Sequence, residues 1–539
     1  MVMKRRVFRL SVLTASTLLF AFSSVFCAPY MIVGPRALGM GGAYTAIGKT
    51  SLGGYWNPGA LGLQTGFDLK INAGGGAEFT GNILDSANNI IKFADEYSKL
   101  KQSQKSGGGM DIKQLSAVSK AIKNLRAVGQ PGNGVVMNVG GGMGIRSGKY
   151  AITVTNYQLI GTRPYTEVNG FYLGSGTFSM PTTGSRVKSA FAGDDDYAGV
   201  SIDTAMAYTP TNPNLLDDRD RIQDEIVWIR ESLEKAGVSI PISNADLANV
   251  LINTAVEGGA TEADIAEAVT TVIDNRELLE LVLGSADPNN SFATNQSNLT
   301  VRGLSVTEIG LSSSWPLTYV ENLHVGGTVK MMMGQTGYFR QMLFTETAGE
   351  DKEIGVGDAV EDMSKNMKGS SQIGLDLGLY YNKMEEWSST FGLVLKNINS
   401  PKFDMPEEGI RYGETNITLD PQIRVGAAYY PLDWISISTD YDLTSNATLI
   451  PSYNSQYFAI GTEINLGNQS YFNIPLRFGM MKNMAAQQDT SAYTGGIGIN
   501  LGHVLLDLSG AMSANETKID ATTSMPANAY AQLGLSLEF

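Results

Sequence analysis

Apolar residues alternate with polar or small residues from about residue 301 to the C-terminus. In the stretch 373–379, Ile373, Leu375, Leu377 and Leu379 alternate with Gly or Asp. The same alternation recurs at 423–427, 472–478, 504–508 and 533–539. A period of two places all the apolar side chains of a strand on one face. Because the other face carries Asp, Arg and Lys, the pattern predicts a barrel wall that stands in lipid.

Very short turns separate these strands in pairs. They lie at 383–385, 431–433, 467–470 and 502–503, and a similar turn at Ser147-Gly148-Lys149 joins strands at about 135–145 and 150–160. With a first strand at about 67–78, three strands precede a long excursion and eleven follow it. The total of 14 is even, as short turns on one periplasmic side require. We therefore expect an all-β fold, a transmembrane antiparallel β-barrel of about 14 strands formed by residues 67–539.

Two insertions interrupt the predicted wall, both on the cell-surface side. Residues 79–133 have helical periodicity, and residues 161–300 begin strand-like (168–173 and 198–208) and then read as a helical bundle. We expect the bundle helices at about 217–236, 244–257 and 262–283, with Thr261 as the N-cap of the last. The stripe Ile222, Ile226, Ile229 and Leu233 indicates a bundle core rather than a cofactor site.

Residues 1–27 have the pattern of a secretory signal peptide. Four basic residues precede an apolar run, and Val25-Phe26-Cys27 stands before Ala28 as the expected cleavage site. The alternative is a lipoprotein anchored through Cys27, which the bulky Phe26 disfavours. Cys27 is the only cysteine, so cleavage after it leaves a mature chain without thiol chemistry. A cleaved signal, barrel-type strands and no long apolar run together predict the outer membrane of a diderm bacterium.

Composition agrees with this location. Charged residues make up 17% of the chain, below the roughly 25% of soluble domains. The formal net charge is -14, and removing the four basic residues of the leader makes it -18 (-14 minus 4). So acidic a chain excludes nucleic acid as an expected partner. Outer-membrane lipid is the expected surrounding.

Small residues are dense just after the leader. One segment reads Gly39-Met40-Gly41-Gly42-Ala43 and the next reads Asn57-Pro58-Gly59-Ala60-Leu61. Such residues suit a chain that lies against other backbone in a confined space, and Asn-Pro marks a turn. These motifs resemble the N-terminal hatch of the FadL/OmpP1-like outer-membrane barrels. The resemblance implies a hatch over residues 28–66 and, independently, 14 strands.

Later motifs are most similar to the conjugal-transfer TraF-like branch of these barrels. They are Thr307 to Leu311, Val394 to Asn397, Asp440 to Thr444, and Ser455-Gln456-Tyr457. The resemblance implies passive uptake of small hydrophobic molecules past the hatch. The alternative is a conjugation- or secretion-associated scaffold, TraF-like or PorV-like, whose surface helices bind a protein partner. A soluble all-β secreted protein is a weaker third hypothesis.

Phasing each strand by its apolar face places charged residues in the lumen. The candidates are Glu308, Lys330, Asp376, Lys396, Arg424, Asp440, Asp442, Glu463, Arg477 and Asp507. One interpretation is a polar conduit or gate against which the hatch rests. The other is that opposite charges pair and fill a plugged barrel. A set of mixed sign is not a selectivity ring.

Catalytic motifs are missing from the sequence. The two histidines, His324 and His503, form no His-Glu-x-x-His motif, and neither a nucleophile elbow nor a phosphate loop occurs. We expect no enzyme, no cofactor and no metal site. Asp194 to Asp196 could hold Ca²⁺, although three adjacent acids are more often simply solvated.

The strand ends carry aromatic residues. They are Trp315, Tyr319, Tyr380, Tyr381, Trp387, Tyr429, Tyr430, Trp434, Tyr471 and Phe472. Their clustering beside the short turns favours an interfacial girdle over strand propensity alone. The C-terminal Phe539 resembles the signal that barrel-assembly machinery recognises.

Overall fold

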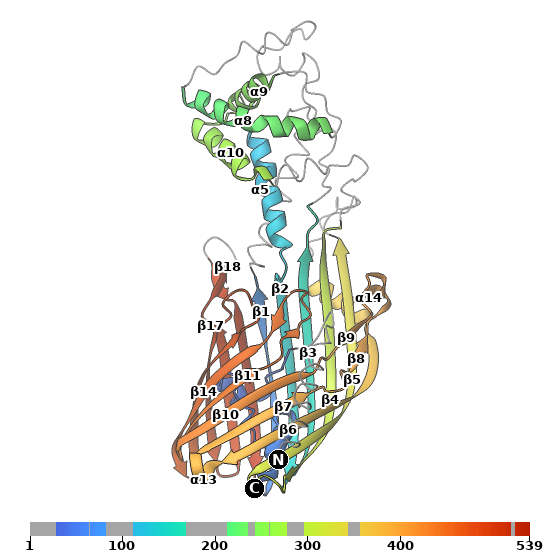
Figure 1. The fold of residues 1–539 in the computed structure, drawn as a ribbon, viewed down its shortest axis with the longest axis vertical. Coiled ribbons are helices and arrows are strands. Elements are labelled where there is room, and N and C mark those ends of the chain that lie inside the picture. Colours follow the sequence, from blue (N-terminus) through green and yellow to red (C-terminus); the bar gives the residue numbers. More distant parts are fainter. Residues whose placement is uncertain are drawn as a thin grey trace, which may run out of the picture.

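Fourteen strands close into one antiparallel barrel (Figure 1). The structure, a computed structural model, describes residues 29–63, 65–81, 83, 112–168, 213–235, 243–257, 259–277, 296–342, 356–469, 471–518 and 523–539. The wall strands are β1 (Phe67–Thr80), β2 (Gly134–Ser147), β3 (Tyr150–Tyr165), β4 (Asn298–Pro316), β5 (Leu323–Met342), β6 (Lys368–Lys383), β7 (Ser389–Lys396), β10 (Gln422–Leu432), β11 (Ile435–Asp442), β14 (Tyr457–Gln469), β15 (Phe472–Asn483), β16 (Ala492–Leu501), β17 (Val504–Ser513) and β20 (Asn528–Glu538). Neighbours pair in this order, and β20 pairs with β1 to close the ring. The predicted fold class and strand number are confirmed.

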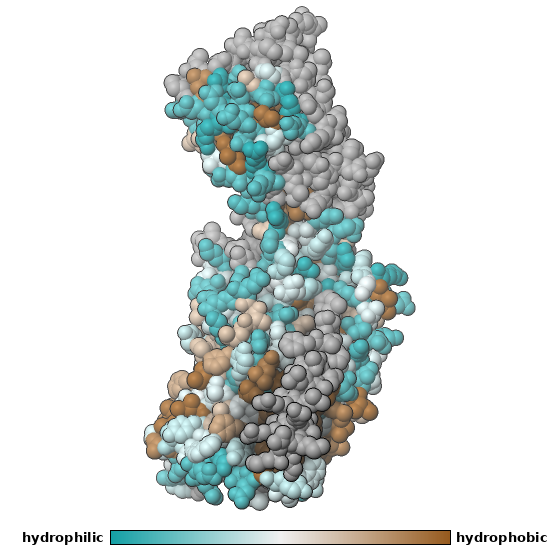
Figure 2. Space-filling model, in the orientation of Figure 1, coloured by the Kyte–Doolittle hydropathy of each residue, from teal (hydrophilic) through white to brown (hydrophobic). Residues whose placement is uncertain are grey.

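The outer face of the wall is apolar. Leu311, Ile373, Leu508 and Leu533 are each about three-fifths exposed, at 60%, 63%, 58% and 61%. Figure 2 shows apolar residues gathered over the lower part of the barrel, between a hydrophilic lower rim and the hydrophilic helices above. This arrangement is typical of a barrel surrounded by lipid.

Short connections lie at one end of the barrel and both long insertions at the other (Figure 1). The β6–β7 turn carries the single-turn helix α13 (Met384–Trp387), and the C-terminus lies at this same end. Gly148 and Gly502 turn the chain with φ of +54° and +67°, a conformation that favours glycine. We call these the turn end and the insertion end.

Two of the aromatic residues assigned to the girdle face inward instead. Tyr380 is fully buried and Tyr430 is partly buried, and the Lys49 Nζ atom lies 5.9 and 5.8 Å from the centroids of their rings. Each has an adjacent tyrosine on the same strand, and successive strand residues point to opposite faces. Only Tyr381 and Tyr429 of these two pairs can therefore face lipid, and the prediction for Tyr380 and Tyr430 was wrong.

Helices from both insertions form one unit at the insertion end. These are α5 (Ile112–Val128), α8 (Pro213–Lys235), α9 (Asn244–Glu257) and α10 (Glu262–Asp274). The contacts of α10 with α5 and α8 bring the two insertions together, and Lys120 Nζ lies 2.6 Å from Glu267 Oε1 across them. Ile222 and Ile226 are fully buried, as a bundle core requires. Thr261 caps α10 in a capping box with Asp264, as predicted.

Other predictions lie outside the described residues. These include the leader, most of the helical stretch before residue 112, the greater part of the segments 168–173 and 198–208, and Asp194 to Asp196. Among the helices that the structure describes, none is long and apolar enough to cross a membrane.

Three small hairpins and two short helices occupy the loops of the insertion end. They are β8–β9 (Lys402–Asp404 and Asn416–Thr418) with α14 (Glu407–Arg411), β12–β13 (Asn446–Ala447 and Asn454–Ser455), β18–β19 (Glu516–Lys518 and Ser524–Pro526), and α12 (Val356–Lys365) before β6. The β8–β9 hairpin folds into the lumen, where the fully buried Phe403 packs over Gly334 of β5. It therefore fills part of the interior above the N-terminal segment.

Candidate functional site

The N-terminal segment 29–63, here called the plug, lies inside the barrel. It contains α2 (Pro35–Gly39), α3 (Gly53–Trp56) and the 3-10 helix η1 (Pro58–Leu63), which contact strands on opposite sides of the ring. Trp56 is fully buried at its centre, with the rings of Tyr30, Tyr44 and Tyr55 at centroid distances of 5.4, 5.5 and 5.9 Å. The plug thus has an aromatic core of its own inside a largely polar lumen.

All ten hatch residues predicted from the sequence are buried in the plug. They are Gly39, Met40, Gly41, Gly42, Ala43, Asn57, Pro58, Gly59, Ala60 and Leu61. Gly41 has φ of +70°, and a Cβ there would lie 2.6 Å from the Met480 carbonyl oxygen. On the wall, a Cβ at Gly479 would lie 2.6 Å from the Gly41 nitrogen. Plug and wall therefore meet backbone to backbone, which only glycine on both sides permits.

Asn57 joins the second half of the plug to the wall. Its Nδ2 atom donates to the Leu379 carbonyl at 3.0 Å and to the Thr45 carbonyl at 3.1 Å, while its Oδ1 accepts from the Gly59 N–H at 3.0 Å. One buried amide thus closes a turn within the plug and binds it to β6.

Asp440 of β11 accepts a cluster of donors from the plug. Its Oδ2 accepts from the N–H groups of Tyr44 and Thr45 at 3.0 and 2.9 Å and from the Thr45 hydroxyl at 2.6 Å. Charge-assisted bonds of this kind are stronger than neutral ones. A carboxylate of the wall therefore holds the middle of the plug.

A chain of four alternating charges crosses from the plug to the wall. Arg36 pairs with Glu463 at 2.7 Å, Glu463 with Arg477 at 2.7 Å, and Arg477 with Asp507 at 2.6 Å. The three wall residues come from β14, β15 and β17 and are buried. Sharing Glu463 between two guanidinium groups satisfies both of its oxygens in a site that excludes water.

A second group of charges lies on β4, β5 and β6. Lys330 Nζ is 3.1 Å from Asp376 Oδ1 and 3.7 Å from Glu308 Oε2, and it donates to Asn397 Oδ1 at 2.8 Å. The Tyr157 hydroxyl donates to Glu308 at 2.9 Å. One lysine between two carboxylates neutralises part of this side of the lumen.

Cations of β7 and β10 contact the aromatic core of the plug. Arg424 forms a bidentate pair with Asp442, at 2.5 and 3.0 Å, and its guanidinium carbon lies 3.8 Å from the Tyr30 ring centroid. Lys396 Nζ lies 3.2 Å from the Tyr55 ring centroid. Such cation–π contacts gain strength when desolvated. The structure therefore places all ten predicted lumen residues inside the barrel, where they pair with one another or contact the plug.

Other lumen residues were missed by sequence reasoning. Asp68 of β1 bonds to Arg146 of β2 and accepts from the Ser51 N–H of the plug at 2.7 Å. Arg302 of β4 pairs with Glu414 of the β8–β9 hairpin at 2.8 and 2.5 Å. The alternation in β1 would have revealed Asp68, because Phe67 and Ile71 are exposed on the outside and Asp68 has the opposite phase.

An apolar surface covers the inner wall between the plug and the insertion end. We call this the apolar strip; its wall residues are Tyr157, Leu159, Leu304, Val306, Met332 and Tyr338, all buried on β3, β4 and β5. The β8–β9 hairpin covers it with Phe403, Met405 and Ile417. Met31 of the plug packs against both this cluster and the plug's aromatic core. Apolar contact thus continues from the insertion end into the plug.

Within the described residues, no group of three or more His, Cys, Asp or Glu side chains is placed to hold a metal ion. What the site can do physically is hold a plug by polar contacts beside an apolar surface.

The architecture is that of a closed 14-stranded antiparallel barrel with its N-terminal segment packed in the lumen. Residues 189–442 match the model of the family described as F plasmid transfer operon, TraF, protein. No curated protein matches the chain.

Several solved barrels are similar to the chain over nearly its whole length. The Ralstonia pickettii toluene transporter TbuX is 13% identical, with 94% of this chain and 98% of that chain covered and a TM-score of 0.40. The P. putida toluene transporter TodX is 9% identical, with 95% and 99% covered and a TM-score of 0.39. A Pseudomonas aeruginosa FadL homologue is 8% identical, with 96% and 99% covered and a TM-score of 0.37.

Proposed function

We propose that the protein is an outer-membrane channel that passes small hydrophobic molecules by diffusion, with the plug as its gate. The observation that carries this proposal is the continuity of the apolar strip with the plug through Met31. If the plug and the paired charges served only to fill the lumen, no apolar surface would be needed inside, because lipid already stabilises the outer face of the wall. Once the plug and the β8–β9 hairpin move away, the apolar strip would favour an apolar solute over water.

The nature of the plug contacts supports gating. Hydrogen bonds and an ion pair join the plug to the wall, from Asp440, Glu463, Asp68 and the Leu379 carbonyl. Each such bond contributes about 0.5–1.5 kcal/mol net, or about 1.5–3 kcal/mol where a charge takes part. Water can replace plug–wall contacts of this strength one at a time. The aromatic core would hold the plug together as a unit while it moves.

Uptake of toluene by cells that contain the protein tests the proposal. Val306→Thr keeps the shape of a fully buried side chain on the apolar strip but adds a hydroxyl there. The matched control is Val139→Thr, the same change at an outward-facing position that is 60% exposed. We expect slower uptake for Val306→Thr alone, at equal amounts of folded barrel. Wild-type uptake no faster than that of cells without the protein would overturn the proposal.

A second candidate function is a scaffold that binds a protein partner through its helices. The observation in its favour is that two insertions far apart in sequence build one helical unit, joined by the Lys120–Glu267 pair. The match to the family named for the F plasmid transfer operon also spans α8, α9 and α10. Deleting residues 213–285 distinguishes the two functions. A scaffold loses its partner in cross-linking experiments, whereas a channel retains toluene uptake.

A further inference from the structure

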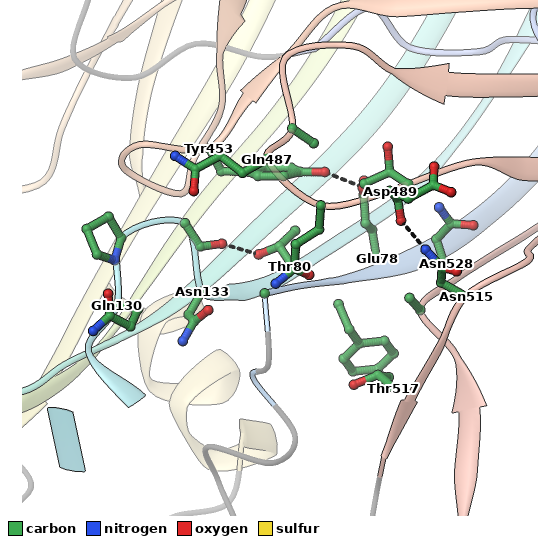
Figure 3. Close-up of a pocket in the computed structure, with 18 of the residues that line it drawn as sticks. Glu78, Thr80, Gln130, Asn133, Tyr453, Gln487, Asp489, Asn515, Thr517 and Asn528 are labelled. Atoms are coloured by element: carbon green, nitrogen blue, oxygen red, sulfur yellow. Dashed lines mark hydrogen bonds between the residues drawn. The ribbon is translucent and has the colours of Figure 1, made fainter. Parts of the chain in front are cut away.

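A polar cavity of about 810 Å³ lies at the insertion end, apart from the plug and the apolar strip. Its walls come from the upper end of β1, the segment that joins α5 to β2, the β12–β13 turn, the loops that follow β15 and β17, and the start of β20 (Figure 3). Most of its lining side chains are amides, hydroxyls and carboxylates. The charged lining residues are Glu78, Asp489, Glu516 and Lys518. The excess of negative charge disfavours an anion, and the polar lining disfavours an apolar solute.

Glu78 is the buried acid of this cavity. It is only 6% exposed, and its two oxygens accept hydrogen bonds from the hydroxyls of Tyr453 and Tyr530. Within the described residues, no lysine, arginine or histidine forms an ion pair with it. The other two acids are engaged, since Asp489 lies 3.3 Å from Lys482 and Glu516 accepts from Ser524. A buried carboxylate without a cation is costly, so this position favours a positively charged ligand.

A second acceptor at the cavity is also unused. Asn528, only 5% exposed, has an Oδ1 atom without a hydrogen-bond donor among the described residues. Figure 3 shows it in the lining of the same cavity as Glu78. A carboxylate and a free amide oxygen beside one cavity call for a ligand that brings several N–H or O–H donors. An ammonium group brings three donors together with the missing charge.

The side chains around Glu78 are held in place before any ligand arrives. Asn483 Nδ2 donates to the Asn454 carbonyl at 2.8 Å and approaches the Tyr453 hydroxyl at 3.4 Å. Thr448 Oγ1 donates to the Tyr453 carbonyl at 2.6 Å. Tyr453 also packs against Val136 and Ile450. This support fixes the phenol that bonds to Glu78, and preorganised groups bind with less entropic cost.

We propose that this cavity binds a small organic ammonium compound whose charge is recognised by Glu78. A bare metal ion fits poorly, because the cavity is many times larger than an ion and both Glu78 oxygens already accept from tyrosine hydroxyls. The site is independent of the apolar strip, so it does not require the proposed channel function.

The test is isothermal titration calorimetry on the full-length barrel in a non-ionic detergent. The probe is putrescine, and 1,4-butanediol is the control of equal carbon length that carries hydroxyls in place of ammonium groups. We expect heat of binding for putrescine and at least tenfold weaker binding for the diol. Glu78→Gln keeps the shape and one acceptor oxygen but removes the charge, and should weaken putrescine binding at least tenfold. Glu386→Gln removes a carboxylate in the turn end and should leave binding unchanged.

Folding is followed separately by heat-modifiable migration on gels, which each variant must retain. Should Glu78→Gln not fold, Tyr453→Phe provides the second variant, since it removes a hydroxyl that holds the carboxylate and should also weaken putrescine binding. Equal binding of diol and putrescine, binding of CaCl₂ in place of putrescine, or putrescine binding that survives Glu78→Gln in a folded barrel would each overturn the proposal.

Discussion

Arg36 in the plug and Glu463 in the wall form a bidentate ion pair across the lumen. The Arg36 Nε and Nη2 atoms donate to the two carboxylate oxygens at 2.8 and 2.7 Å. The Arg36 side chain is 31% exposed, whereas the Glu463 side chain is only 4% exposed. Glu463 has a second partner in Arg477, and Arg477 has a further one in Asp507. The two residues of the pair are therefore not equivalent.

Removing the carboxylate should cost more than removing the plug's guanidinium. Arg36→Met leaves Glu463 paired with Arg477, so we expect a loss of about 1 kcal/mol, the upper value for pairs with an exposed partner. Glu463→Gln leaves both Arg36 and Arg477 without this carboxylate as a partner. Breaking a buried ion pair in this way costs about 3–5 kcal/mol of stability. Thermal unfolding of the detergent-solubilised protein compares the two variants. An equal effect of the two changes would contradict this expectation, because it would show that the pairing of Glu463 with Arg477 adds nothing to stability.

Gly41 and Gly502 offer a matched test of how tightly the plug fits. Both have left-handed backbone, with φ of +70° and +67°. An alanine Cβ at Gly41 would meet the Met480 carbonyl oxygen at 2.6 Å, whereas nothing lies within 4 Å of one at Gly502. Both Gly→Ala changes cost about 1–2 kcal/mol of backbone strain. Gly41→Ala should cost about 1–3 kcal/mol more through overpacking.

The readout for this pair is toluene uptake and susceptibility of the plug to protease, at equal amounts of folded barrel. Gly41→Ala should displace the plug and change both measurements, and Gly41→Trp should do so more strongly. Gly502→Ala should change neither. Identical behaviour of the two alanine variants would mean that the plug adapts freely and does not act as a fitted gate.

Phe539 closes the barrel through its backbone and stacks through its ring. Its N–H donates to the Phe67 carbonyl at 2.9 Å, and its carbonyl accepts from the Phe67 N–H at 3.1 Å. The ring stacks on His503 at a centroid distance of 4.8 Å. Deleting Phe539 removes both backbone bonds and the ring contact with His503. We expect a large loss of heat-modifiable barrel from the outer membrane, whereas Phe539→Tyr should assemble normally.

The cap of α10 predicts a local effect of pH outside the barrel. The Thr261 backbone N–H donates to the Asp264 carboxylate and holds its pKa below the usual value. A lowered folded-state pKa stabilises the capped helix above the unfolded pKa of about 3.9, and this stability is lost as the pH falls through the folded value. The protection of the first-turn amides of α10 from hydrogen exchange, relative to an unstructured peptide at the same pH, should therefore fall at acid pH. Asp264→Asn should remove this dependence, whereas Thr271→Val, in the last turn of the helix, should retain it.

Strand periodicity alone located most of the wall and the charges inside it. Each wall strand from β4 onward has an apolar outward face, so the inward position of a residue such as Arg477 follows from its phase. In β1 the run Gly74-Gly75-Gly76 interrupts the alternation, and Asp68 was missed although the residues before that run keep their phase.

Tertiary features that leave no periodic pattern in the sequence could not be predicted from it. The β8–β9 hairpin contains only three residues in each strand, and its inward fold depends on the space that Gly334 leaves for Phe403. The packing of α5 on α10 joins segments separated by more than a hundred residues. Tyr380 shows the opposite error, because an interfacial preference was assigned to a residue whose strand phase already pointed inward.

The β8–β9 hairpin is attached to the wall by a small set of contacts whose loss should open the apolar strip. Glu414 accepts two hydrogen bonds from Arg302, and the guanidinium carbon of Arg340 lies 4.2 Å from the Tyr412 ring centroid. Glu414→Gln removes the charge that faces Arg302, so we expect the hairpin to leave the lumen more often. Trypsin should then cut after Arg411, which is exposed on α14, several times faster than in the wild type.

Glu407→Gln is the matched control, because it removes the same charge from an exposed position on the same hairpin. It should leave the trypsin rate unchanged. If the hairpin covers the path of an apolar solute, faster cleavage in Glu414→Gln should be accompanied by faster toluene uptake. Faster cleavage with unchanged uptake would mean that the hairpin moves but does not limit passage, and the path would then have to bypass Phe403.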